Sequence, residues 1–211
     1  MHDEAPQRIG IFGGTFDPIH IGHLLIAECC REELELAEVR FVLAATAPHK
    51  QHVSSAEAKH RWEMLRLAIG GNANFAADDR ELRRGGTSYT FETLAELHRE
   101  FPTTELVFLT GADSLAEFHT WREPTEICRL ARVVVVARGG LPAPNMELLR
   151  PYLESRDQPA NLAEHIVAIP QIELSSTHIR NCISQRRSIR YQVPPAVEAY
   201  IAAHNLYRGS I

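Results

Sequence analysis

Two histidines three residues apart follow a pair of glycines near the start of the chain. In the stretch GIFGGTFDPIHIGHLL, Gly13 and Gly14 end an apolar run, and His20 and His23 open the next segment. Adjacent glycines permit positive φ and let a ligand approach the main chain closely. Histidines at this spacing share one helix face, and the N-terminus of a helix attracts anions. The corner therefore predicts either a phosphate site or a plain tight turn with two surface histidines.

The familiar phosphate-binding loops are absent from the sequence. Neither G-x-G-x-x-G after this strand nor G-x-x-x-x-G-K-[ST] anywhere is found. Metal chelation by the two histidines is the weaker interpretation, because no carboxylate or cysteine accompanies them at ligand spacing. No Ser-His-Asp or Cys-His arrangement indicates nucleophilic catalysis. A phosphate at this corner would be held by the histidines and by backbone N–H groups.

Several cations could assist an anionic ligand. They are Lys50, Arg61, Arg84, Arg138 and Arg180. Taken one at a time, each reads more readily as a solvated surface charge than as a site residue. The formal net charge of −5 argues against a protein that coats nucleic acid, and it leaves room for a small anionic ligand that needs only a few local cations.

The elements that must position these residues alternate along the chain. Strands are predicted over residues 8–12, 39–44, 73–77, 105–110, 132–137 and 165–170. Helices are predicted over 19–36, 56–69 (capped by Ser54 or Ser55), 88–101, 176–184 and 195–204. Near-continuous apolar strands separated by helices indicate a doubly wound α/β fold with a mostly parallel sheet. Ligands bind such sheets at the carboxyl ends of the strands, where the glycine–histidine corner falls.

Length and composition limit the organisation and location of the chain. At 211 residues, with 45% hydrophobic and 23% charged residues, we expect one globular domain over 1–211 with a helical part from about residue 175 to 211. No apolar run reaches the ~18–20 residues that span a bilayer, and the polar start does not resemble a signal peptide. The four cysteines form no C-x-x-C pair, which favours free thiols in the cytoplasm. The sequence leaves open whether the chain forms a homo-oligomer.

A family resemblance covers residues 8–207. GGTFDPIHIGH at 13–23 resembles the T/H-x-G-H motif of the nucleotidyltransferase superfamily, which is related to the HIGH motif of class I aminoacyl-tRNA synthetases. Within that superfamily the chain resembles bacterial nicotinate-nucleotide adenylyltransferases. The matching segments, in order, are APHK at 47–50, RRGGTSYTFETL at 83–94, LTGADSLAEFHTW at 109–121, ARGG at 137–140, ELSSTHIR at 173–180 and SIRYQVPPAVEAYIAAHNLY at 188–207.

The resemblance implies a Rossmann-like nucleotidyltransferase domain with a defined reaction. AMP passes from ATP to nicotinate mononucleotide, which gives nicotinate adenine dinucleotide and pyrophosphate in NAD biosynthesis. The substrate phosphate attacks in line without a covalent intermediate, and Mg²⁺ accompanies the ATP. A phosphate monoester with a second pKa near ~6 is ionised at neutral pH and needs no general base. The enzyme then works by positioning and charge neutralisation.

The resemblance also implies the site residues. The catalytic set is His20, His23 and Arg180. The ATP-binding set is Gly13, Gly14, Thr15, Phe16, His20, His23, Gly111, Asp113, Ser175, Ser176, Thr177 and Arg180. The nicotinate mononucleotide set is Lys50, Ser88, Tyr89, Thr90, Trp121 and Arg138. No protein ligand to a metal is implied. From the residues alone, Ser175–Thr177 and Asp113 read equally as helix caps, and Trp121 as a core side chain.

Two positions of the chain depart from the family pattern, and three functions other than this adenylyl transfer have to be weighed. Thr87 and Gly139 stand where the family pattern has proline, which we expect to loosen both loops. A sister adenylyltransferase could take nicotinamide mononucleotide or phosphopantetheine as acceptor. A nucleotide-binding sensor without catalysis would share the fold, but it is disfavoured because both histidines and Arg180 are present. A class I synthetase is disfavoured because no K-M-S-K-S segment exists.

Overall fold

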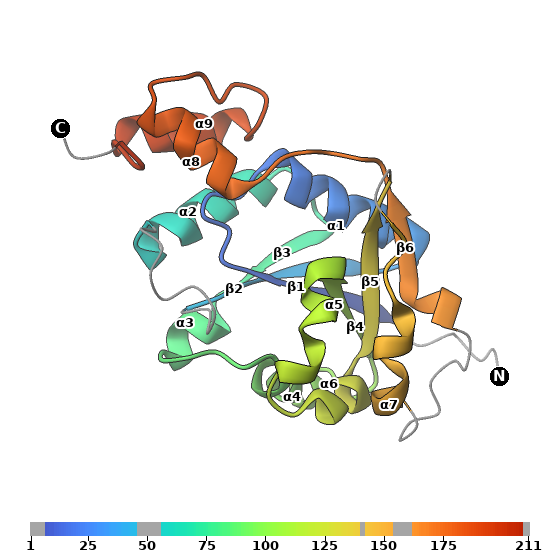
Figure 1. The fold of residues 1–211 in the computed structure, drawn as a ribbon. Helices are drawn as coiled ribbons and strands as arrows, with labels where there is room; N and C mark the ends of the chain where they lie inside the picture. The colour runs from blue at the N-terminus through green and yellow to red at the C-terminus, as the bar shows by residue number, and fades with distance from the viewer. Residues whose placement is uncertain (1–6, 46–55, 140–141, 154–161, 209–211) are drawn as a thin grey trace.

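Six parallel strands form one open sheet at the centre of the protein (Figure 1). The computed structural model describes residues 7–45, 56–139, 142–153 and 162–208. The strands are β1 (Arg8–Gly14), β2 (Glu38–Leu43), β3 (Phe75–Asp78), β4 (Glu105–Gly111), β5 (Arg132–Arg138) and β6 (Ile166–Ile169). Their order across the sheet is β3-β2-β1-β4-β5-β6, and every neighbouring pair is parallel. The strand order reverses between β1 and β4, which is the switch point where such sheets bind ligands.

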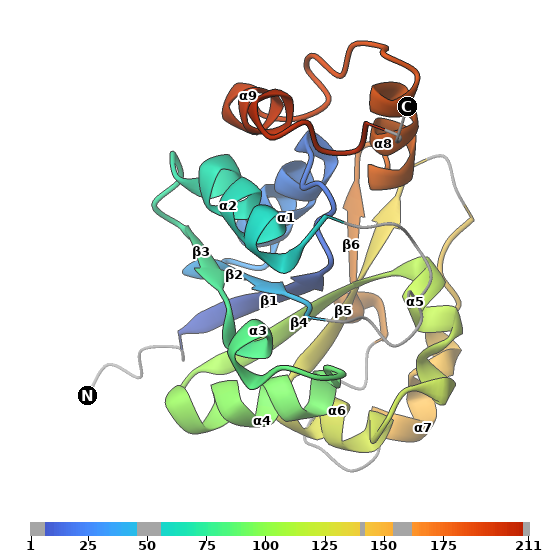
Figure 2. The same cartoon turned by 90° about the vertical axis from the view of Figure 1, so that its left-hand side faces the viewer.

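Helices cover both faces of this sheet. They are α1 (Ile21–Glu33), α2 (Ala58–Ile69), α3 (Arg80–Arg84), α4 (Thr90–Glu100), α5 (Ala112–Ala116), α6 (Pro124–Leu130), α7 (Arg150–Leu153), α8 (Ser176–Ser184) and α9 (Pro195–Ala203). The described residues also form short 3₁₀ turns, which are η1 (Phe118–Thr120), η2 (Met146–Leu148) and η3 (Leu162–His165). Figure 2 shows α1 and α2 on one face and α4, α6 and α7 on the other. Among the described residues, no helix is long and apolar enough to cross a membrane.

The strand β5 shows why the apolar runs are nearly continuous. Val133 and Val135 pack into the core with α4 and α6, whereas Val134 and Val136 pack into the core with α1 and α2. Successive side chains of a strand point to opposite faces, so a sheet covered on both sides needs apolar residues at every position. The predicted doubly wound α/β fold is therefore confirmed.

The two C-terminal helices extend one of these cores. Ile179 of α8 and Val197 and Ile201 of α9 belong to the same buried cluster as α1 and α2. Figures 1 and 2 both show α8 and α9 beyond α1 and α2, at the end of the sheet where β1 finishes. This packing brings the start of α8 next to the β1–α1 connection.

The predicted elements are all present, with boundaries that differ by no more than three residues. One detail is wrong: α2 begins after Glu57, which caps it without a side-chain hydrogen bond, rather than after Ser54 or Ser55, which lie outside the described residues. The helices α3, α5, α6 and α7 were not predicted. Each has seven residues or fewer, too short for a periodic apolar pattern to emerge.

Candidate active site

A cavity of about 650 Å³ lies beyond the carboxyl ends of β1 and β4. Its lining combines the β1–α1 corner, the start of α5, the end of η1 and the start of α8. The predicted residues that line it are Gly13, Gly14, Thr15, Phe16, His20, His23, Gly111, Asp113, Trp121, Ser175, Ser176, Thr177 and Arg180. The fold thus brings together every residue predicted for ATP, although they come from segments far apart in the sequence.

The two histidines stack on each other at the start of α1. Their ring centroids lie 3.7 Å apart with an interplanar angle of 22°. His20 is the N-cap residue and is buried, while His23 occupies the third helical position. The backbone N–H of His20 donates to Nδ1 of His23 at 3.2 Å. Because Nδ1 of His23 accepts, a neutral His23 ring carries its proton on Nε2, where it can be donated to a ligand.

The glycines of the corner leave room for neighbouring groups, and their backbone does not adopt a conformation that only glycine permits. Gly13 and Gly14 are the last residues of β1, and neither uses the positive φ that glycine permits; the left-handed residue of this turn is Phe16, with φ of 44°. A Cβ on Gly14 would lie 2.8 Å from the Phe16 ring, whereas a Cβ on Gly13 would meet no protein atom within 4 Å. A Cβ on Gly22 would lie 3.1 Å from Nδ1 of His20. The absent side chains make room for two rings and for the cavity.

The start of α8 is fixed to the same corner. The Ser175 hydroxyl is the N-cap and accepts from the backbone N–H of His178 at 3.1 Å, so the cap interpretation holds for this residue. The Ser176 hydroxyl donates to the backbone oxygen of Pro18 at 2.9 Å. The hydroxyl has a single proton, which is used in that bond, so the donor that Ser176 can offer an anion is its backbone N–H. The Ser175 hydroxyl keeps its own proton for donation.

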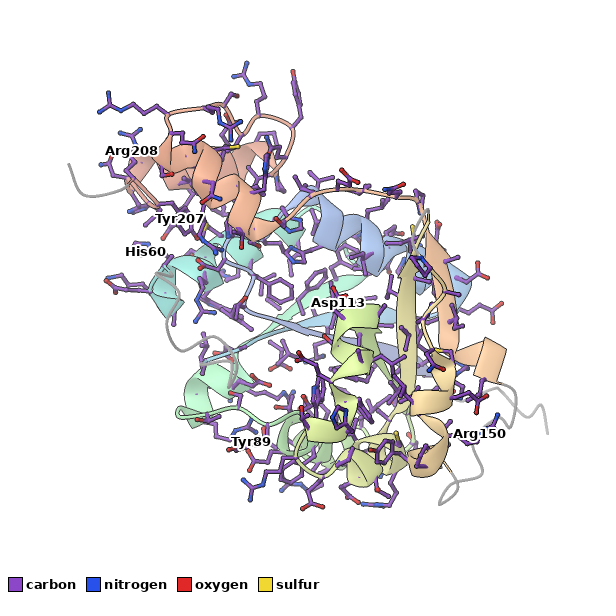
Figure 3. All side chains as sticks on the ribbon, in the orientation of Figure 1. His60, Tyr89, Asp113, Arg150, Tyr207 and Arg208 are labelled. Carbon is purple, nitrogen blue, oxygen red and sulfur yellow. The ribbon has the colours of Figure 1, made fainter. Side chains whose placement is uncertain are left out.

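Arg180 and Asp17 join the helix to the corner. The Arg180 guanidinium donates from Nη1 to the backbone oxygen of Asp17 at 2.7 Å and from Nη2 to Oγ1 of Thr177 at 3.2 Å. The Asp17 carboxylate is buried, and its Oδ1 accepts from the Tyr207 hydroxyl at 2.7 Å and from the Ala56 backbone N–H at 3.1 Å. Tyr207 follows α9 in the C-terminal tail (Figure 3). Sequence reasoning gave no role to Asp17 or Tyr207, although both lie within the matched segments.

Arg61 is a buried cation of the cavity wall. Its guanidinium donates to the backbone oxygens of Thr15, Ala44, Ala45 and Ala56 at 2.9, 2.8, 3.2 and 3.2 Å. Burial lowers the pKa of this guanidinium below its ordinary value. All four of these hydrogen bonds go to carbonyl oxygens rather than to a carboxylate, so the positive charge is retained beside the cavity. The surface-charge interpretation is wrong for Arg61.

Gly111 and Asp113 stand at the start of α5. Gly111 is the N-cap, so the cap interpretation of Asp113 is wrong, and its carboxylate lies in the first turn of the helix, exposed. Figure 3 shows Asp113 near the middle of the molecule, at the end of α5 that faces the carboxyl ends of the strands. In the part of the chain that the structure describes, no group of three or more His, Cys, Asp or Glu side chains could hold a metal ion.

Trp121 packs against core side chains and also forms part of the cavity wall. It follows η1, and its ring packs against Phe118 and Phe108 with centroids 5.4 and 6.0 Å apart. It also lines the cavity and is only partly buried. Trp121 therefore anchors its loop in the core and exposes part of its surface to the cavity.

The other residues predicted for the nicotinate side do not line this cavity in the part of the chain that the structure describes. Ser88, Tyr89 and Thr90 lie at the start of α4 and are not part of the cavity lining. The Arg122 guanidinium lies 4.7 Å above the Tyr89 ring, which links this segment to the loop after Trp121. Lys50 lies outside the described residues, as does the side chain of Arg138, whose backbone ends β5.

The two departures from proline have different consequences. The Gly139 backbone N–H donates to the backbone oxygen of Ile169 at 2.9 Å, a hydrogen bond that proline cannot make. Gly139 therefore extends the pairing of β5 with β6, while the loop that we expect to be loosened continues into residues outside the described part of the chain. Thr87 follows Gly85 and Gly86, each with φ of 70°, so the turn is made by the glycines before it.

Comparisons with known proteins agree with this geometry. The model of the cytidylyltransferase-like family matches residues 11–182. A probable nicotinate-nucleotide adenylyltransferase of Rhodopirellula baltica is 44% identical over 97% of this chain and 95% of its own length. One of Thermus thermophilus is 45% identical over 96% of this chain and 100% of its own. The Plasmodium falciparum nicotinic acid mononucleotide adenylyltransferase complexed with NaAD superposes with a TM-score of 0.77 at 20% identity, covering 97% of this chain and 98% of that one.

Proposed function

This chain belongs to the cytidylyltransferase-like family and, within it, to the nicotinate-nucleotide adenylyltransferases, and from that membership we propose that it transfers AMP from ATP to nicotinate mononucleotide. The products are nicotinate adenine dinucleotide and pyrophosphate. The observation that carries the proposal is the convergence of two helix N-termini, those of α1 and α8, on one cavity at the switch point of the sheet. Such N-termini bind phosphate through backbone N–H groups and the helix dipole.

The reaction requires one bond to form and one to break at the α-phosphorus of ATP. A phosphate oxygen of nicotinate mononucleotide forms the new P–O bond, and the bond from the α-phosphorus to the bridging oxygen of the pyrophosphate breaks. The nucleophile is already ionised, so no protein base is needed. Mg²⁺ bound to the triphosphate, which enters with ATP as substrate, neutralises part of the negative charge.

The ATP side uses the residues that the fold gathers around the cavity. His20 and His23 stabilise the charge that develops on the transferred phosphate, and Arg180 binds the β- and γ-phosphates. The backbone N–H groups of residues 14–16 and 175–177 complete the phosphate site. Asp113 binds a ribose hydroxyl. The closeness of these side chains supports the assignment.

On the acceptor side, Trp121 stacks on the pyridinium ring, which gains from cation–π attraction. Ser88, Tyr89 and Thr90 bind the nicotinate from the start of α4, with Thr90 and its neighbouring N–H groups at the carboxylate. Lys50 and Arg138 approach the phosphates.

We place the whole chain in one nucleotidyltransferase domain in the cytoplasm, and the four free cysteines support that location.

One assay tests the function directly. The protein is incubated with ATP and Mg²⁺, and pyrophosphate release is measured with nicotinate mononucleotide, nicotinamide mononucleotide or phosphopantetheine as acceptor. We expect the fastest turnover with nicotinate mononucleotide. Turnover with phosphopantetheine alone would identify a sister adenylyltransferase, and ATP binding without turnover on any acceptor would identify a nucleotide sensor. Either of these results refutes the proposal.

A further inference from the structure

The Asp17 carboxylate is a meeting point of three distant segments. Its Oδ1 accepts from the Tyr207 hydroxyl at 2.7 Å and from the Ala56 backbone N–H at 3.1 Å. Its Oδ2 lies 3.8 Å from Nη1 of Arg180. The carboxylate is 4% exposed, so its charge is poorly screened by water. A group that donates a hydrogen bond to this carboxylate therefore also changes how strongly the carboxylate attracts the cations around it.

Arg180 is close to Asp17 but is not fully engaged by its carboxylate. The short contact, 2.7 Å from Nη1, goes to the Asp17 backbone oxygen, and Nη2 donates to Thr177. A direct charge-assisted hydrogen bond between guanidinium and carboxylate has an N–O distance of about 2.7–2.9 Å. The 3.8 Å separation from Oδ2 falls outside that range. The guanidinium, which lines the cavity, thus keeps charge and donors for another anion.

Tyr207 supplies the donor that holds Asp17 in this arrangement. Burial, together with the negative charge of Asp17, raises the pKa of the Tyr207 phenol above its ordinary value. The hydroxyl is therefore protonated near neutral pH and always available as a donor. If it were removed, Oδ1 would keep the Ala56 N–H alone among its donors in the described residues, and the carboxylate would draw the Arg180 guanidinium closer.

We propose that Tyr207 is a positioning residue for adenylyl transfer: its hydroxyl occupies the Asp17 carboxylate, so that Arg180 stays free to bind the β- and γ-phosphates of ATP. The inference rests on the proposed function. It adds a residue of the C-terminal tail to the ATP site, although that residue does not touch the nucleotide. In its absence Asp17 competes with the triphosphate for the same cation.

The test compares Tyr207→Phe with a matched control. Tyr200→Phe removes a second phenol hydroxyl, which bonds Nδ1 of His60 at 3.0 Å between α9 and α2. We expect Tyr207→Phe to raise the KM for ATP about tenfold, the cost of one charge-assisted hydrogen bond, and to leave the KM for nicotinate mononucleotide unchanged. Tyr200→Phe should leave both values as in the wild type. Equal effects of the two variants, or no effect of Tyr207→Phe, would overturn the inference.

A second variant separates charge competition from a loss of tail packing. Asp17→Asn removes the carboxylate charge, so the double variant Tyr207→Phe/Asp17→Asn should regain most of the ATP affinity that Tyr207→Phe loses. A double variant no better than Tyr207→Phe refutes the competition. Binding of a non-hydrolysable ATP analogue, measured by calorimetry, reports the same differences without an acceptor. If the wild type binds this analogue but releases no pyrophosphate, the proposed function fails. The calorimetric comparison of the variants still tests the effect of Tyr207 on ATP binding.

Discussion

Replacing Gly13 with alanine should weaken ATP binding without destabilising the protein. A Cβ at this position meets no protein atom within 4 Å, and Gly13 lines the cavity. The backbone there does not have positive φ, so alanine is accepted without strain, and the free energy of unfolding should stay level or rise by about 0.4–1 kcal/mol. The methyl group instead takes space from the ligand. Overpacking of about 1–3 kcal/mol corresponds to a roughly 5- to 150-fold loss of affinity for ATP.

Gly14→Ala is the matched comparison, with the opposite expected result. Its Cβ would lie 2.8 Å from two atoms of the Phe16 ring, which is 2% exposed and cannot move into solvent. The strain should cost about 1–3 kcal/mol of folding free energy. For a domain of this size each kcal/mol lowers the Tm by about 2–4 °C, so we expect a fall of roughly 2–12 °C.

Two measurements on each variant decide the matter. Thermal unfolding followed by circular dichroism gives the change in Tm, and calorimetry with a non-hydrolysable ATP analogue gives the affinity. We expect Gly13→Ala to lose affinity at unchanged Tm and Gly14→Ala to lose Tm. If Gly13→Ala binds the analogue as tightly as the wild type, the cavity beside Gly13 is not the ATP site. If it unfolds at as low a temperature as Gly14→Ala, the open space around a Cβ at position 13 does not govern stability.

Three further predictions follow from other parts of the molecule. His20→Ala should lower kcat about 10²–10³-fold, as loss of a transition-state donor does, with an unchanged circular dichroism spectrum; a near-normal kcat would remove the histidine from the mechanism. Trp121→Ala should raise the KM for nicotinate mononucleotide about 2- to 30-fold, the range of one cation–π contact, while Trp121→Phe retains part of the affinity and the KM for ATP is unaffected in steady-state assays. Arg80→Ala should cost about 1.5–3 kcal/mol in urea unfolding at pH 7, because the buried Asp78 carboxylate then keeps the longer contact with Arg40 at 3.4 Å in place of its hydrogen bonds from Arg80. Burial raises the pKa of Asp78, but the hydrogen bonds from Arg80 outweigh it and hold the pKa below its ordinary value. The stability from this pair is therefore present above about pH 4 and lost as the pH falls further, so the difference between Arg80→Ala and the wild type should shrink in acid.

The sheet could be predicted from the sequence because its signal is local. In the run RVVVVA each valine reports burial on its own face, and four such residues in a row identify a strand covered on both sides. The position of the site followed, since residues at carboxyl strand ends share one edge of a parallel sheet. Short helices such as α5 gave no such signal.

The contacts that complete the site could not be predicted because they join distant residues. The Ser176 hydroxyl bonds a carbonyl 158 residues away, and nothing in SSTHIR indicates that its proton is used in this way. Arg61 sits on an amphipathic helix, where an arginine usually faces solvent, and only the fold shows its donors turned inward. The sequence left two roles open for the glycines of the corner, backbone freedom and space for a ligand, and only their neighbours in space distinguish the two.

The bond between Asp17 and Tyr207 also bears on the order in which the protein folds. The two residues are 190 positions apart, so their contact closes nearly the whole chain into a loop. Contacts of such separation carry a large entropic cost until the intervening segments are already compact. We therefore expect the sheet and its two cores to assemble first and nucleotide binding to appear as a late event in refolding. A folding intermediate that precedes this step would have native secondary structure but would not bind ATP.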